Sequence, residues 1–91
     1  MKKCMDAANL HRRLGTIIGQ VPAIDRMVDE DVPCEDGLAQ IHAAKAARNK
    51  CGGVIMQGHI QHCIRDGLRH GDADRIIANF TKAVERFANM N

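Results

Sequence analysis

The feature that most constrains this chain is a long apolar series at helical spacing through its middle. The series runs from Leu38 to Leu68 in the steps of three and four residues that mark one face of a helix. Gly52 and Gly53 interrupt it at a cost of about 2 kcal/mol relative to alanine, but no Pro, Asn or Asp adjoins them. The pattern therefore predicts a continuous helix over about residues 34–69.

A shorter helix is expected on each side of this one. Apolar residues at the same spacing predict the first over about residues 6–30, bent near Pro22 because proline removes a backbone donor. Gly71 and the aspartates that follow it are typical of a helix stop and a new start. A third helix is therefore predicted over about residues 73–89.

The composition favours an all-α fold in a single domain that spans residues 1–91. The only aromatic side chains are Phe80 and Phe87, so the core must be built from Ala, Leu, Ile, Val and Met, which suits packing between helices. One chain of this length cannot bury a middle helix far longer than its neighbours, and a partner subunit is therefore expected.

The expected location is the cytoplasm. No apolar run in the sequence is long enough to span a membrane, and the amino terminus lacks the apolar stretch of a secretory signal. In a cytoplasmic protein, the four cysteines are expected to be thiols, metal ligands or redox groups before they are disulfides.

Two candidate metal ligands lie one turn apart in the predicted middle helix. His59 and Cys63 are four positions apart and so share a helix face, whereas His62 points away from Cys63. A third candidate, Cys34, precedes His59 by 25 positions, which is about 37 Å along a continuous helix. Cys34 cannot reach the same ion within one chain. An antiparallel pairing of two copies would bring Cys34 of one chain to His59 and Cys63 of the other.

The chemistry of these ligands indicates the kind of metal. Two thiolates and an imidazole form a soft set that favours Cu(I), with Zn(II) an alternative if a fourth ligand is present. Cys4 is a candidate for that extra ligand, although an exposed thiol at a frayed chain end is the plainer expectation. Cys51 lies about three turns before Cys63 and is expected in the core.

Two groups of basic residues stand out against a formal net charge of only +2. Arg12 and Arg13 lie in the first predicted helix, and Lys45, Arg48 and Lys50 lie within two turns of the second. Antiparallel packing of these helices would merge the groups into one surface suited to nucleic acid. A charge cluster is also typical of any solvated helix face, and no recognition-helix, zinc-finger or aromatic stacking pattern accompanies it.

Three segments together carry a family resemblance: RRLGTIIGQVPAIDRMVDEDVPC, LAQIHAAKAARNK and GHIQHC. The chain resembles the copper-sensitive operon repressor family (CsoR/RcnR/FrmR) of metal-sensing transcriptional repressors. The likeness is close over about residues 9–69 and loose in the third helix. The spacing of Cys34, His59 and Cys63 is that of the Cu(I)-sensing branch.

This resemblance implies both an assembly and a function. Members are antiparallel helical dimers that pair into homotetramers and contain no helix-turn-helix. The apo form binds operator DNA, and metal binding releases it so that metal export or resistance genes are expressed. Basic positions on the first two helices contact DNA in this family, and the matching residues here are Arg13 and Lys45, with Lys50 a further basic position.

The sequence departs from the family at two positions that usually support the metal site. Pro33 stands where copper sensors often have Tyr, and Asn79 stands, by ungapped count, where they often have Glu. Such outer partners orient metal ligands and tune the metal. The identity of the metal therefore stays open, and a Ni(II), Co(II) or Zn(II) sensor of the same family, with Cys4 as an added ligand, is one alternative.

A second alternative is a metal-buffering or thiol-redox helical protein without a DNA function. An enzyme is not expected, because the sequence contains no nucleophile–base pair and no phosphate-binding loop, and the candidate ligands have no acid–base carboxylate beside them. Neither a membrane nor a small-molecule substrate is expected as a partner.

Overall fold

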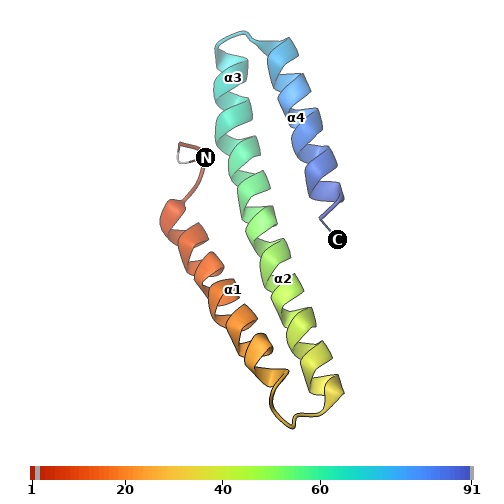
Figure 1. Cartoon of the computed structure of the whole chain (residues 1–91). Coiled ribbons are helices and arrows are strands. Elements are labelled where there is room, and N and C mark those ends of the chain that lie inside the picture. Colours follow the sequence, from red (N-terminus) through yellow and green to blue (C-terminus); the bar gives the residue numbers. More distant parts are fainter. Residues whose placement is uncertain (2, 91) are drawn as a thin grey trace.

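The computed structural model describes residue 1 and residues 3–90, and every regular element among them is helical (Figure 1). Lys2, one of the basic residues near the amino terminus, lies outside the described residues. The order of elements is α1 (Ala7–Met27), α2 (Cys34–Gly58), η1 (His59–Ile64), α3 (Arg65–Arg69) and α4 (Ala73–Ala88). This confirms the all-α fold. None of the helices in this described part combines the length and apolar character needed to cross a bilayer.

The three middle elements form one uninterrupted rod from Cys34 to Arg69. The backbone stays in the right-handed helical region where they join, at His59, Ile64 and Arg65, and the two central glycines remain helical. The continuous helix predicted over residues 34–69 is therefore confirmed. Within this helix, residues 59–64 form a π-helix, whose wider turns close i→i+5 hydrogen bonds, a detail that the prediction did not include.

Helix α1 begins at an N-cap and continues through its proline. The Asn9 backbone N–H donates to the Asp6 side chain at 3.1 Å, which satisfies one free donor of the first turn. Pro22 lies inside the helix without ending it. The predicted end at residue 30 is slightly late, because residues 28–30 form a turn beyond Met27.

Helix α4 follows a sharp reversal at Gly71. This glycine has φ of +75°, a left-handed conformation that glycine adopts without a steric penalty. Asp72 is then the N-cap residue of α4. The third helix predicted over residues 73–89 is confirmed within one residue.

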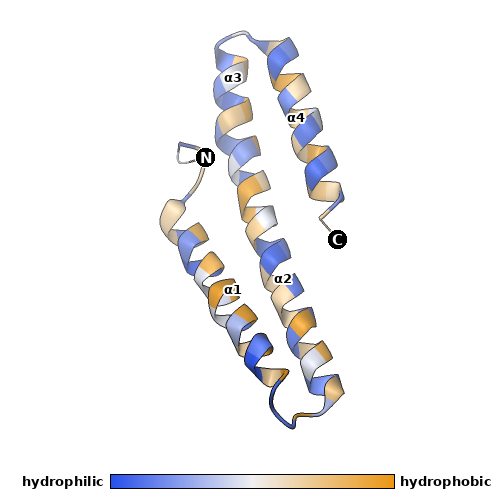
Figure 2. Ribbon diagram, viewed as in Figure 1, coloured by the Kyte–Doolittle hydropathy of each residue, from blue (hydrophilic) through white to orange (hydrophobic). Residues whose placement is uncertain are grey.

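Figure 1 shows the rod flanked by α1 along one half and by α4 along the other, both antiparallel to it. Of the described residues, only Leu10 and Cys51 are buried, at 7% and 5% exposure. The radius of gyration is 17.3 Å, whereas a compact domain of this length would have about 12 Å. Figure 2 shows apolar positions along every helix. One chain by itself therefore leaves most of its large apolar side chains in solvent.

We predict that Gly71→Ala lowers the free energy of unfolding by about 1–2 kcal/mol, because a Cβ is strained at positive φ. Gly71→Asn is the matched control and should cost less, since Asn tolerates this region. Urea denaturation followed by circular dichroism at one fixed protein concentration measures both variants. Equal stability of the alanine variant and the wild type would contradict this account of the turn.

Candidate metal centre

The π-helical segment η1 contains the ligands predicted for the middle helix. His59 begins it, and Cys63 lies near its end. Both side chains are partly buried and line the same two grooves, whereas His62 is exposed and lines only one of them. π-turns inside α-helices are rare and occur frequently at functional sites. The local backbone therefore distinguishes this stretch from the rest of the rod.

The two grooves share three lining residues, Cys4, His59 and Cys63. One is polar, has a volume of about 760 Å³ and extends along α3 to Arg75 and Asn79 of α4. The other is apolar and has a volume of about 410 Å³. Four methionines line the apolar groove: Met1, Met5, Met56 and Met90. Soft sulfur-containing side chains therefore surround one side of the candidate site.

The imidazole of His59 has an unpartnered nitrogen. Its Nε2 atom is buried, and among the described residues no group forms a hydrogen bond with it. A buried polar atom left in this way costs about 1–3 kcal/mol, so such atoms usually have a partner or a function. A soft metal ion would use the Nε2 lone pair, and the sulfur atom of Cys63 on the same segment is also a donor that soft metals accept. The residues present therefore fit a soft metal.

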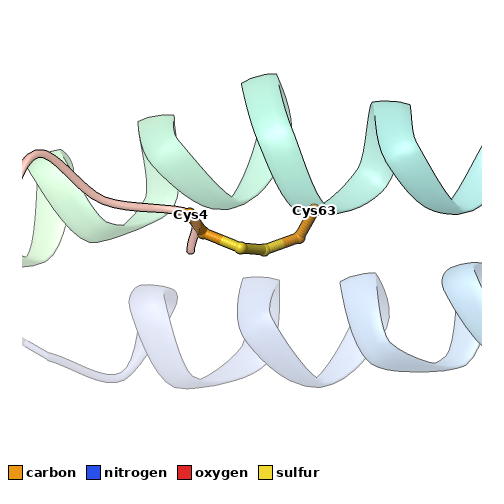
Figure 3. The surroundings of a disulfide bond; sticks show 2 residues. All are labelled: Cys4 and Cys63. Carbon is orange, nitrogen blue, oxygen red and sulfur yellow. A yellow bond between two sulfur atoms is a disulfide. The ribbon is translucent and has the colours of Figure 1, made fainter. Parts of the chain in front are cut away.

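Cys63 is joined to Cys4 by a disulfide, with the two Cα atoms 5.8 Å apart (Figure 3). The expectation that all four cysteines are thiols or ligands before disulfides is therefore wrong for this pair. So is the plainer expectation for Cys4, which is partly buried instead of lying at a frayed, exposed end. Cys4 lines both grooves together with His59 and Cys63, so the structure does bring it to the predicted ligands.

Cys4 reaches Cys63 because the amino-terminal segment, here Cys4 and Met5, packs against the rod at Gly58. A Cβ at this position would lie 2.5 Å from the carbonyl oxygen of Cys4 and 2.8 Å from the Sδ atom of Met5. The absence of a side chain at Gly58 thus provides the space into which the segment docks. Neither Gly58 nor Met5 was singled out from the sequence, and no local pattern distinguishes Gly58 from the other glycines in the helix.

Cys34 lies far from this site within one chain. It is the first residue of α2, it is exposed, and its thiol is free. Its neighbour Pro33 is the N-cap residue, with extended backbone and no side-chain capping bond. Within residues 1 and 3–90, no three His, Cys, Asp or Glu side chains are arranged to hold a metal. Cys51 is buried, as expected.

The basic residues lie on α1 and on the half of the rod that packs against it. Arg13 precedes the end of α1 by 14 positions, and Arg48 follows the start of α2 by 14, so antiparallel packing puts both about 21 Å from the connecting loop. Arg12 and Arg13 each donate to Asn9 Oδ1 at 3.0 Å. Asn9, which the sequence analysis missed, therefore orients both guanidinium groups.

The other three basic residues do not share one face. Arg48 donates to the backbone carbonyl of Met90 and, at 3.3 Å, to Asn49 Oδ1. Lys45 and Lys50 are exposed, and Lys50 lies about 200° around the helix from Arg48. The two groups lie at a common level, but Arg48 turns toward the end of the chain, and their merging into one surface stays a prediction.

Comparison with known proteins gives consistent matches. The sequence profile of the metal-sensitive transcriptional repressor family matches residues 6–87. The copper-sensing transcriptional repressor CsoR of Bacillus subtilis is 31% identical over 86 residues, which cover 94% of this chain and 85% of that protein. The copper-sensing transcriptional repressor RicR of Mycobacterium tuberculosis is 34% identical over 80 residues, or 86% of this chain and 83% of that protein. No solved structure matches the chain significantly.

Proposed function

Since the chain belongs to the metal-sensitive transcriptional repressor family, we propose that its apo form binds operator DNA and that Cu(I) releases it. Release would permit expression of genes for metal export or resistance. The observation that carries this proposal is the pairing of His59, which has an unpartnered buried nitrogen, with Cys63 on one π-helical turn. The relatives named above are transcriptional repressors, and an enzymatic activity is not part of the proposal.

We assign the metal ligands to two chains. His59 and the reduced thiol of Cys63 would come from one protomer, and Cys34 from its partner. The continuous rod supports this assignment, because it separates Cys34 from His59 by about 37 Å. Bound Cu(I) would supply a soft, charged centre that fixes the two protomers relative to each other. Asn79 lines the polar groove with both ligands and is proposed as an outer partner.

A Ni(II), Co(II) or Zn(II) sensor that uses Cys4 as an added ligand is the second candidate. The observation that favours it is the position of Cys4, whose side chain lines both grooves beside His59 and Cys63. We prefer Cu(I), because the donor set is soft and because the related repressors are named as copper-sensing.

The working form in this proposal is an antiparallel homodimer that pairs into a homotetramer. The exposed apolar side chains support it, since they lie at helical spacing on three elements: Leu14, Ile18 and Val21 on α1, Leu38 and Ile41 on α2, and Ile77 and Val84 on α4. Rows of exposed apolar side chains along helices are costly on a monomer and typical of an interface. Burying it in a second copy would also bring Cys34 of the partner within reach of the site.

DNA contact is proposed for Arg12, Arg13, Lys45, Arg48 and Lys50. Phosphate contacts dominate the affinity of proteins for DNA and make it depend on salt. Lys45 and Lys50 are exposed and free to move to a phosphate, whereas the hydrogen bonds of Arg48 to Met90 and Asn49 must first be given up. We therefore expect the two lysines to contribute more than Arg48.

We predict that the reduced wild-type protein shifts operator DNA in a mobility assay at low salt and that Cu(I) abolishes the shift. Cys34→Ala, His59→Ala and Cys63→Ala should keep the apo shift but lose the response to Cu(I). Each should also weaken Cu(I) binding by at least about 10-fold, which is the cost of losing an outer partner alone. Competition with a chromophoric Cu(I) chelator measures that affinity.

The matched control is His62→Ala, which removes an imidazole from the same turn and should behave like the wild type. Ni(II), Co(II) and Zn(II), added in separate reactions, should leave the DNA complex intact. An apo protein that gives no shift, or a shift that Cu(I) leaves unchanged, would refute the proposed function.

We predict that Leu38→Glu dissociates the assembly. The Leu38 side chain is 71% exposed in one chain and buried in the proposed interface, where a carboxylate in its place would lose its hydration. Light scattering after size exclusion should give a multiple of 10.0 kDa for the wild type and a smaller multiple for the variant. Gln40→Glu, at an exposed polar position of the same helix, should keep the wild-type mass. A monomeric wild type would contradict the proposed assembly.

We predict that Lys45→Ala and Lys50→Ala each weaken operator binding by the apo protein. Each lost phosphate contact should also reduce the slope of log affinity against log salt by about 0.9. Fluorescence anisotropy over a salt series measures both quantities. Lys82→Ala removes an exposed lysine of α4 and should change neither quantity. An equal effect of all three variants would indicate that net charge, and not contact by particular lysines, determines the affinity for DNA.

A further inference from the structure

The disulfide between Cys4 and Cys63 takes a thiol that the metal centre needs. We propose that these two cysteines form a reversible redox pair, so that hydroperoxides close the disulfide and make the protein unresponsive to Cu(I). The existence of the redox pair stands on its own, whereas its effect on copper rests on the proposed function, in which Cys63 is a metal ligand.

The contact between the two cysteines is specific. They lie 59 residues apart in the sequence, yet their Cα atoms are 5.8 Å apart, within the range of roughly 4.4–6.8 Å that a disulfide requires. Two features hold the amino-terminal segment in this place. The Asp6 side chain caps α1 directly after the segment, and Gly58 leaves the space that Cys4 and Met5 occupy.

The four cysteines differ in their access to an oxidant and to a second thiol. Cys51 is buried at 5% exposure, and Cys34 is exposed at the other end of the rod. Cys4 and Cys63 are partly buried, line open grooves and lie beside each other. Accessible thiols next to a resolving cysteine are the ones that oxidise reversibly. The geometry therefore selects this pair within one chain.

The chemistry balances with a hydroperoxide as the oxidant. One thiol attacks the O–O bond, becomes a sulfenic acid and releases water or an alcohol. The second thiol then attacks the sulfenic sulfur, the S–S bond forms, and a second molecule, water, leaves. The protein loses two electrons and two protons in total. A dithiol reductant reverses the reaction by thiol–disulfide exchange.

Oxidation changes the metal centre directly. The sulfur of Cys63 is then bonded to Cys4 and no longer offers a thiolate, which is the form that binds metals. His59 keeps its buried Nε2 atom, but this imidazole and the partner's Cys34 are then two donors where the proposed site has three, and the tight soft site is lost. The oxidised protein therefore stays in its apo form in the presence of Cu(I).

The test begins with reduced full-length protein treated with hydrogen peroxide, quenched with catalase and alkylated. Mass spectrometry of peptides should find Cys4 linked to Cys63, and free thiols should fall from four to two per chain. Cu(I) affinity, measured against a chelator, should fall by at least about 10-fold and return after treatment with dithiothreitol. Cys4→Ser should retain its Cu(I) affinity after the same peroxide dose.

Two matched variants test the docking of the segment. Gly58→Ala adds a Cβ against the Cys4 backbone while improving helix propensity, so the disulfide should form several-fold more slowly. Gly53→Ala makes the same exchange where a Cβ meets nothing within 4 Å and should oxidise at the wild-type rate. Cys51→Ser should also give the linked peptide at the wild-type rate.

Three outcomes would overturn the proposal. The first is a peroxide-treated wild type without the Cys4–Cys63 peptide, or with a covalent dimer joined through Cys34 in its place. The second is the linked peptide together with unchanged Cu(I) affinity. The third is a reduced Cys4→Ser protein that has lost Cu(I) binding, because Cys4 would then be a ligand. If reduced wild type does not bind Cu(I), the proposed function fails, and the linked peptide still decides the redox pair.

Discussion

The unbroken helical rod from Cys34 to Arg69 is the constraint on which the rest of the molecule depends. Because the rod does not fold back, α1 and α4 can each cover only one half of it (Figure 1). No closed core results, and only Leu10 and Cys51 are buried among the described residues. The same continuity keeps Cys34 away from His59 and Cys63. The exposed apolar side chains and the separation of the candidate ligands therefore follow from one property of the backbone.

The sequence predicted the elements well, because their signals are local. Apolar residues in steps of three and four located the rod, and Gly71 marked its end through the left-handed turn that glycine allows. The π-turn at His59–Ile64 could not be predicted in the same way. Its residues fit α-helical spacing equally well, so the periodicity of apolar residues does not distinguish the two kinds of helix.

The position of Cys4 shows the limit of local reasoning more clearly. A cysteine near the start of a chain is expected to be exposed, and the cytoplasmic location expected from the sequence argues against disulfides. Both generalisations failed here because the contact joins residues 59 positions apart and depends on Gly58 having no side chain. The candidate ligands His59 and Cys63 were found from their spacing, whereas the partner of Cys63 within the chain required the tertiary structure.

In the two proposals, copper and oxidation compete for one sulfur atom. The effect of copper on the reduction potential of the cysteine pair can be estimated. A ligand that binds only the reduced form, present at about 100 times its Kd, stabilises that form by about 2.7 kcal/mol. For a two-electron couple this raises the reduction potential of the disulfide pair by about 58 mV, at 30 mV per 1.4 kcal/mol, so that the pair is harder to oxidise. Oxidation weakens copper binding by the same linkage. The order in which the two signals arrive therefore matters less than their relative strength, since Cys63 can report only one of them at a time.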